Sequence, residues 1–146
     1  MKIVELTDAN GQVAEEAWLA RAERVHRQLR PKLPEDYAGK MRRVFAGGAR
    51  MCVATEGERV LGVAVYRISE NTFSGVNLYV DDLVTDETER SKGVGRALLD
   101  HLQRRARESG CETLCLDSGV QRARAHQFYF REGLHITSFN FKKPLS

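Results

Sequence analysis

The fold depends on residues 83–102, which read Leu-Val-Thr-Asp-Glu-Thr-Glu-Arg-Ser-Lys-Gly-Val-Gly-Arg-Ala-Leu-Leu-Asp-His-Leu. An apolar strand is predicted to end near Val84, and a short acidic loop follows it. A helix is predicted to begin at Gly93, because apolar side chains then recur at helical spacing on one face. This succession of strand, glycine turn and helix favours an α/β fold.

The glycine turn has the chemistry of an anion-binding site. Gly93 and Gly95 have no Cβ, so a ligand can approach the backbone closely. The first N–H groups of a helix lack intrahelical partners, and the helix dipole places partial positive charge there. Arg90, Lys92 and Arg96 add positive charge around the same point. We therefore predict a loop that holds pyrophosphate.

The turn differs from two common phosphate-binding motifs. A Walker loop requires Gly-x-x-x-x-Gly-Lys-Ser/Thr, which this stretch lacks. The dinucleotide fingerprint fits better, since Gly93 and Gly95 supply its first two glycines and Asp117 follows at a predicted strand end. However, Leu98 occupies the place of the third glycine. A nicotinamide-dependent dehydrogenase is therefore a distant alternative.

The composition is that of an ordinary soluble domain. The 146 residues are 42% hydrophobic and 29% charged, which is enough for one domain with a substantial core. The net charge of +3 is small and no basic run is interleaved with aromatic residues, so we expect no nucleic-acid binding. No run approaches the ~20 apolar residues of a membrane helix, and the first residues lack a signal-peptide core. We expect a cytoplasmic protein without membrane contact.

The cysteines do not indicate a disulfide framework. Cys52, Cys111 and Cys115 are odd in number and lie within apolar, strand-like runs. Buried thiols in a reducing compartment fit this pattern better. The chain has no Cys-x-x-Cys and no paired histidine spacing, so we expect no metal site.

The periodicity along the chain predicts the order β-α-α-β-β-β-α-β-α-β. Antiparallel hairpin strands come first, and a β-α-β crossover that contains the glycine turn comes second. The expected fold is a single-domain α/β structure with a mixed, mostly antiparallel sheet and helices on both faces. The predicted elements are strand 2–6, helix 12–29, helix 35–45, strands 51–55, 59–68 and 75–84, helix 93–109, strand 112–116, helix 122–132 and a closing strand 134–142.

Two motifs together resemble the GNAT superfamily of acyl-CoA-dependent N-acetyltransferases. The first is Arg-x-x-Gly-x-Gly at residues 90–95, between a strand that ends Leu-Val and an amphipathic helix. The second, at residues 122–134, reads Arg-Ala-Arg-Ala-His-Gln-Phe-Tyr-Phe-Arg-Glu-Gly-Leu and is similar to the family's Asn-x-x-Ala-x-x-Phe-Tyr-x-x-x-Gly-Phe. Arg122 and Leu134 depart from the family's asparagine and phenylalanine. The motifs cover about the C-terminal half, in the family's order and spacing.

The resemblance implies an enzyme that moves an acetyl group from acetyl-CoA to a primary amine by direct transfer in a ternary complex. The backbone at the end of the strand would pair with the pantetheine amides like an added strand. The N–H groups of the loop would hold the pyrophosphate. The cofactor-binding residues implied in this way are Leu83, Val84, Thr85, Arg90, Ser91, Lys92, Gly93, Val94, Gly95, Arg96 and Arg122.

Tyr129 occupies the position of the family's general acid. A phenol with a pKa of about 10 stays protonated at neutral pH and can donate to a thiolate whose acid has a pKa near 8.5. The alternative is a tyrosine that only packs through its ring, between Phe128 and Phe130.

Asp82 is the candidate base. Two carboxylates in an apolar strand are unusual, because alternation sends Asp81 and Asp82 to opposite faces. Asp82 would join the apolar face of the strand unless a bulge intervenes. A half-buried carboxylate could order the substrate ammonium and accept its proton, directly or through water; a solvated or capping acid is the alternative. Glu89 and His126 are further candidates for the proton acceptor. His26, His101 and His135 are expected to be structural. Asp117 and Ser118 are expected to cap the last helix, with contact to a ligand as the alternative.

The acceptor is expected to be a small-molecule or peptide amine, attracted by Asp81, Asp82 and one of the acids at Glu35 and Asp36. A domain that binds acyl-CoA as a sensor or interaction module, without turnover, is the alternative of a different class. Because the family often dimerises, a homodimer is a further expectation.

Overall fold

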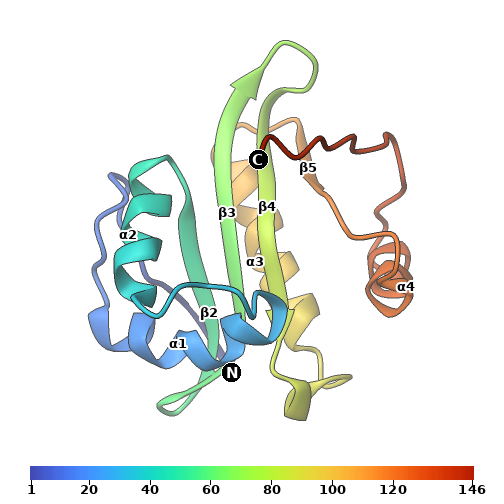
Figure 1. Cartoon of the computed structure of the whole chain (residues 1–146). Helices are drawn as coiled ribbons and strands as arrows, with labels where there is room; N and C mark the ends of the chain where they lie inside the picture. Colours follow the sequence, from blue (N-terminus) through green and yellow to red (C-terminus); the bar gives the residue numbers. More distant parts are fainter. The chain divides into compact units, whose positions relative to one another are not determined.

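The computed structural model describes residues 1–146 and divides into two units, residues 1–115 and 116–146 (Figure 1). Each unit is described by itself. The first unit contains β1 (Lys2–Glu5), α1 (Glu16–Leu29), α2 (Tyr37–Ala46), β2 (Arg50–Glu56), β3 (Arg59–Asn71), β4 (Gly75–Thr85), the short 3-10 helix η1 (Glu87–Glu89) and α3 (Val94–Glu108). Strand β5 (Thr113–Leu116) ends at the junction, and α4 (Ala123–Arg131) belongs to the second unit. The prediction of a single domain stays a prediction.

The five strands form one sheet in the order β1-β2-β3-β4-β5. The pairs β1–β2, β2–β3 and β3–β4 are antiparallel. Helices cover both faces of this sheet. Successive residues of β2 point to opposite faces, so their neighbours show which helices cover each one. Met51 and Val53 share one buried cluster with α1 and α2, whereas Cys52 and Ala54 point to the other face, against α3. The predicted fold class is therefore confirmed.

Helix α3 lies close to the sheet at Gly62 of β3. A Cβ on this glycine would lie 2.7 Å from Cγ1 of Val94 and 2.9 Å from Cδ1 of Leu98. The same Cβ would lie 3.1 Å from the carbonyl oxygen of Val84. The absence of a side chain at Gly62 thus lets the first turn of α3 pack directly on β3 and β4, which positions the loop that precedes the helix.

A β-bulge interrupts β4 at Asp81. Val65 of β3 pairs with Asp82, but the next residue, Tyr66, pairs with Val80, so Asp81 is the extra residue. Such an insertion changes which side chains face each side of the sheet. Val80 therefore lies on the α3 face with Tyr66, while Asp82 lies with Val65 on the face covered by α1 and α2.

The second unit contains α4 and an extended tail. The amide of Leu134 donates a hydrogen bond of 3.0 Å to the carbonyl of Tyr129 just after the end of the helix. The prediction of a closing strand over 134–142 is wrong, since these residues have no regular secondary structure. An alternating sequence indicates which residues a strand would bury, but a strand exists only where a neighbour supplies hydrogen-bond partners. Phe139 and Phe141 are accordingly 83% and 93% exposed.

None of the helices in the structure is both long enough and apolar enough to cross a lipid bilayer.

Candidate functional site

The last residues of β4 offer backbone groups that point away from β3. The amide of Asp86 donates to the carbonyl of Leu61 at 2.8 Å, which sets the hydrogen-bonding register of the β3–β4 ladder. In an antiparallel ladder, one residue directs its N–H and C=O groups toward the partner strand, and the next directs both of them away from it. Val84 therefore bonds toward β3, whereas the N–H and C=O groups of Leu83 and Thr85 face the opposite side.

Strand β5 does not cover this outward edge. Glu112, just before β5, donates its amide to the carbonyl of Val76 at 2.8 Å, and the thiol of Cys115 lies 3.9 Å from the side-chain oxygen of Asn77. The four residues of β5 thus lie beside the beginning of β4. Within the first unit, the outward groups of Leu83 and Thr85 thus lie beyond the part of β4 that β5 adjoins, where the amides of an extended chain could pair with them.

The loop from Arg90 to Gly93 leads directly into α3. Its residues are exposed, while Val94 is buried beneath it. Gly93 is the N-cap residue, with a left-handed φ of +84°, and no side chain caps the helix. The N–H groups of the first turn are thus directed at whatever lies in front of the helix, as an anion site requires. Ser91 also has a left-handed φ of +65°, which is uncommon for a residue with a Cβ.

Asp86 anchors the beginning of this loop. Its side chain is 1% exposed and accepts hydrogen bonds from Arg24 at 2.6 Å and from Gln28 at 3.2 Å, both on α1. Its carboxylate also accepts from the amide of Thr88 and caps η1. The hydrogen bond from Arg24 is the main cause that lowers the pKa of Asp86 to about 2. The loop is therefore tied to α1 by an ionised, buried carboxylate.

Glu89 holds the middle of the loop. Its carboxylate pairs with Arg59 of β3 and, at 3.3 Å, with Lys92. The hydrogen bond from Arg59, followed by that from Lys92, lowers the pKa of Glu89. These contacts give Glu89 a place in shaping the loop.

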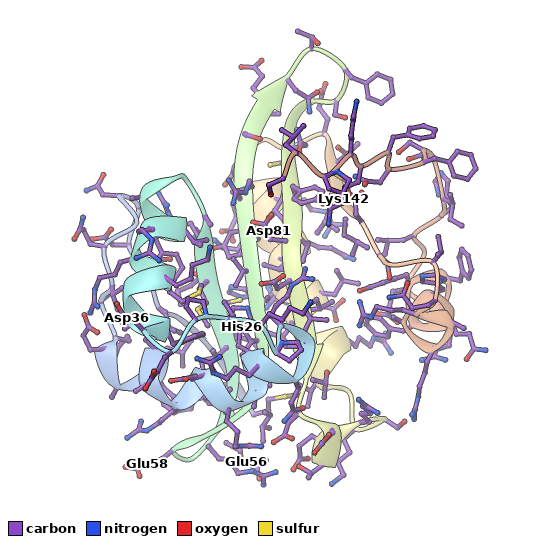
Figure 2. The ribbon with its side chains drawn as sticks, viewed as in Figure 1. His26, Asp36, Glu56, Glu58, Asp81 and Lys142 are labelled. Atoms are coloured by element: carbon purple, nitrogen blue, oxygen red, sulfur yellow. The ribbon has the colours of Figure 1, made fainter.

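The bulge brings Asp82 to the C-terminal half of α1. Its Oδ2 lies 2.7 Å from Nε2 of His26, and its Oδ1 accepts from Nε of Arg30 at 2.8 Å (Figure 2 labels His26 and the neighbouring Asp81). Asp81 pairs with Arg67 of β3 at 2.9 Å. Burial acts to raise the pKa of Asp82, but the hydrogen bonds and charges of His26 and Arg30 outweigh it and lower the pKa. Asp82 is therefore an ionised carboxylate at neutral pH.

Arg122 and Tyr129 lie together in the second unit. Burial is the main influence on the Tyr129 phenol and raises its pKa, while the charge of Arg122 and a hydrogen bond from it act in the opposite direction. His126 lies one turn before Tyr129, and its Nε2 contacts the carbonyl oxygen of Gly119 at 2.8 Å. Asp117 accepts from the side chain of Asn140 at 3.0 Å.

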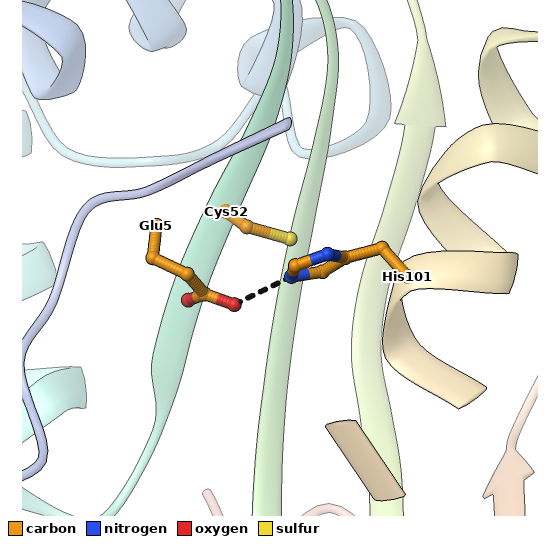
Figure 3. A group of neighbouring side chains, drawn as sticks. All are labelled: Glu5, Cys52 and His101. Atoms are coloured by element: carbon orange, nitrogen blue, oxygen red, sulfur yellow. Dashed lines mark hydrogen bonds and ion pairs between the residues drawn. The ribbon is translucent and has the colours of Figure 1, made fainter. Parts of the chain in front are cut away.

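A second polar cluster lies on the α3 face of the sheet, where Glu5, Cys52 and His101 converge (Figure 3). Their donor atoms lie within 4.8 Å of one another. The Glu5 carboxylate already accepts from Tyr66 and from His101, and Arg105 lies 3.6 Å away. A guanidinium at this position opposes a second cation, so the contacts of Glu5 are better explained as a partly buried ion-pair network than as a metal site.

The structure brings the predicted residues together in two groups. Within the first unit, Asp82 and the strand end 83–85 continue into the loop 90–96. Within the second, Arg122 contacts Tyr129. Sequence reasoning missed the roles of Asp86, Arg30 and Tyr37 and treated His26 as structural only. The available signal was a histidine on the apolar face of α1, beside Ala22 and Val25.

Comparison with known proteins identifies the family. A sequence model of the Acetyltransferase (GNAT) family matches residues 12–134. The chain therefore belongs to the GNAT acetyltransferase family.

Two curated relatives are N-acetyltransferases. The chain is 42% identical over 88 residues to the uncharacterized N-acetyltransferase YhdJ of Bacillus subtilis, a match that covers 60% of this chain and 61% of that one. It is 35% identical over 66 residues to the aminoalkylphosphonate N-acetyltransferase of Salmonella typhimurium, covering 45% and 43%. The chain thus matches less than two thirds of the length of these relatives.

Solved structures share the fold. The aminoglycoside N-acetyltransferase AAC(6')-Iy in complex with CoA has a TM-score of 0.80 and 17% identity, and the match covers 99% of this chain and 95% of that one. A putative acetyltransferase from Agrobacterium tumefaciens has a TM-score of 0.79 and 23% identity, covering 99% of both chains.

Proposed function

We propose that this protein is an acetyl-CoA-dependent N-acetyltransferase that transfers the acetyl group directly to a primary amine within a ternary complex. One observation carries the proposal: outward-facing amides at the end of β4 lead into an uncapped helix N-terminus. Acyl-CoA presents the matching succession, with pantetheine amides followed by a pyrophosphate. The family, the N-acetyltransferase relatives and the CoA complex of a protein with this fold support the same cosubstrate.

The cosubstrate would bind along a continuous length of backbone. Leu83 and Thr85 would exchange hydrogen bonds with the pantetheine amides, while Val84 contributes its side chain to the core. The N–H groups and side chains of residues 90–96 would hold the pyrophosphate. Residues 83–85 span about 10 Å. The thiol end of the arm would therefore reach the bulge, beside Asp82.

The transfer involves three proton movements: the ammonium group loses one proton before attack, and the nitrogen loses a second as the amide forms, which balances the proton that the departing thiolate takes up. The amine nitrogen attacks the thioester carbonyl carbon, and the C–S bond breaks as the amide forms. Asp82 would order the ammonium group and accept its proton, directly or through water. Tyr129 would donate its phenolic proton to the departing thiolate, because its raised pKa keeps the phenol protonated at neutral pH. Arg122, which contacts Tyr129, would bind the cosubstrate.

The acceptor would be a small-molecule or peptide amine. Asp81 and Asp82 provide negative charge for an ammonium group, and each is paired with an arginine, Arg67 and Arg30. Paired charges of both signs suit an acceptor that carries an amine and an anionic group. This agrees with the aminoalkylphosphonate substrate named for one relative. We expect aminoalkylphosphonates to be acetylated faster than polyamines without an anionic group.

The test is a panel of amines incubated with acetyl-CoA and the purified protein. Release of free CoA thiol and the mass of the acetylated product are both measured, for the wild type and for Tyr129→Phe. We expect Tyr129→Phe to lower kcat by about 10²-fold, since a general acid contributes on this scale. Acetyl-CoA should still raise the Tm of the variant. If acetyl-CoA stabilises the wild type but no amine is acetylated, a non-catalytic acyl-CoA-binding domain replaces this proposal.

A further inference from the structure

A chain of polar side chains connects α2, α1 and β4 inside the first unit. Nδ1 of His26 lies 2.8 Å from the hydroxyl of Tyr37, and Nε2 lies 2.7 Å from Oδ2 of Asp82. His26 is 1% exposed and Tyr37 is 3% exposed, so water does not replace these contacts. The two rings meet edge to face, with centroids 5.6 Å apart. Both nitrogens of a buried histidine are therefore committed to specific partners.

We propose that His26 and Tyr37 are positioning residues for the acetyl transfer, and that together they hold Asp82 as an oriented, ionised carboxylate at the β4 bulge. The proposal rests on the N-acetyltransferase function proposed above and adds two residues to it. Neither residue needs to touch the substrate, because both act through Asp82.

The hydrogen-bond directions follow from the chemistry of the three groups. Nε2–H of His26 donates to the Asp82 carboxylate, which can only accept when ionised. In the neutral ring, Nδ1 then has no proton and accepts from the hydroxyl of Tyr37. Burial is the main cause that raises the pKa of Tyr37, so this phenol stays protonated and remains a donor. Tyr37 thereby selects the tautomer of His26 that supports Asp82.

The bulge makes this support necessary. With regular alternation along β4, Asp82 would share the α3 face with Val80; the bulge at Asp81 instead directs the carboxylate to the apolar side that contains Val65 and Val84. A carboxylate in such surroundings tends to bind a proton and lose its charge. The donors His26 and Arg30 prevent this, and the side chain of Asp82 is still 13% exposed. One face of the carboxylate is thus fixed by protein while an edge stays accessible to an ammonium group.

The charged groups around His26 and Tyr37 lie on α1 or directly after it. Arg30, the residue directly after α1, pairs with Asp82, and Arg27 of α1 lies over the Tyr37 ring at 5.9 Å. Glu23 of α1 also acts on Tyr37 through its negative charge. In the proposed role, transfer requires Asp82 to be ionised. Loss of the donor at His26 would raise the pKa of Asp82, so the acid limb of the pH–rate profile would move to higher pH.

The test compares Tyr37→Phe and His26→Leu with a matched control, Tyr66→Phe. Tyr66 is also a buried tyrosine that donates to a carboxylate, Glu5 at 3.0 Å, but it lies on the α3 face. Two quantities are measured: the titration of the Asp82 carboxyl carbon by NMR, and kcat/KM for the amine as a function of pH.

Tyr37→Phe and His26→Leu should raise the pKa of Asp82 and move the acid limb with it. They should lower kcat/KM for the amine by roughly 10- to 100-fold, as a displaced reacting group does, while KM for acetyl-CoA stays the same. His26→Gln, whose amide can donate to Asp82, should recover part of the loss. Tyr66→Phe should leave the Asp82 titration and the profile unchanged.

The proposal is overturned if the Asp82 titration is the same in wild type, Tyr37→Phe and His26→Leu, or if Tyr66→Phe changes it equally. Should a variant fail to fold, the imidazole nitrogen resonances of wild-type His26 decide the matter: Nε2 is expected to carry a proton, and a bare Nε2 contradicts the proposal. The NMR measurements need no turnover, so they stand even if no amine is acetylated and the proposed function itself fails.

Discussion

Asp86→Asn is the substitution that most directly tests how the loop before α3 is held. Asparagine keeps the shape of the side chain and an oxygen that can accept from Thr88, but it removes the charge that pairs with Arg24. A fall of the pKa from an ordinary 3.8 to about 2 reports the stabilisation of the ionised carboxylate in the folded state. That fall corresponds to roughly 2.4 kcal/mol.

The expected loss of stability is smaller than this figure. The side chain of Arg24 is 62% exposed, so solvent and salt screen its charge. We expect Asp86→Asn to lower the free energy of unfolding by about 1–2 kcal/mol at pH 7. For a chain of this length, the loss corresponds to a Tm lower by about 3–8 °C.

The pH dependence gives a sharper test than the loss at a single pH. Because the pKa of Asp86 is lower in the folded state, the unfolded chain binds the proton more readily as the pH falls. The contribution of Asp86 is complete above its ordinary pKa of 3.8 and is lost as the pH approaches about 2. Wild type and Asp86→Asn should therefore differ in stability at pH 7 and converge in acid.

The assay is urea unfolding followed by circular dichroism from pH 7 down to the acid limit, together with KM for acetyl-CoA. Glu87→Gln is the matched control, because Glu87 is the next residue, is exposed and does not cap η1. Asp86→Asn should also raise KM for acetyl-CoA, since the loop loses its attachment to α1, whereas Glu87→Gln should not. Equal stability of wild type and Asp86→Asn at pH 7, or a difference that persists unchanged in acid, would refute the role assigned to Asp86.

Three glycine and serine substitutions test the backbone around the loop. Gly93→Ala should cost about 1 kcal/mol of stability, because a Cβ disfavours left-handed φ, and it should raise KM for acetyl-CoA. The control is Gly48→Ala, at a φ of +110° with open space around it. This variant should lose stability but keep the KM for acetyl-CoA. Ser91→Gly should gain up to about 1 kcal/mol by relieving the φ of +65°. Gly62→Ala should lower the free energy of unfolding by about 1–3 kcal/mol through overpacking, as measured by urea unfolding. Adding Val94→Ala to the same chain should recover part of this loss. Unchanged stability of Gly62→Ala would contradict the close approach of α3.

The local features around the loop could be predicted because they depend on residues near one another in sequence. The spacing of apolar residues in α3 and the glycines before it specify a helix that begins after a tight turn. The structure confirms the helix, which begins at Val94, and the left-handed N-cap at Gly93. Alternation likewise predicts the four antiparallel strands, whose core residues point to two covered faces. The closing strand failed because pairing depends on a neighbour that a sequence pattern does not supply.

The polar contacts of the site could not be predicted in the same way. The sequence left open whether Asp82 joins the apolar face of β4 or is moved by a bulge. Pairing with β3 decides this, because the register leaves Asp81 as an unpaired bulge residue and turns Asp82 toward α1. His26 is 56 residues away from Asp82 along the chain, and Arg24 is 62 residues away from Asp86. Periodicity cannot indicate such pairs, because it reports only which face of an element is buried.

The sequence by itself determined the chemical character of the strand, glycine loop and helix over residues 83–102, because backbone amides, φ angles and helix termini follow from local residue types. The tertiary structure alone decided which carboxylates stay ionised and what holds them. Asp82 lies in β4 and Asp86 directly after it, four positions apart, and each takes a partner from α1. A carboxylate's charge depends on the donors packed around it in space, and folding brings those donors from distant parts of the chain.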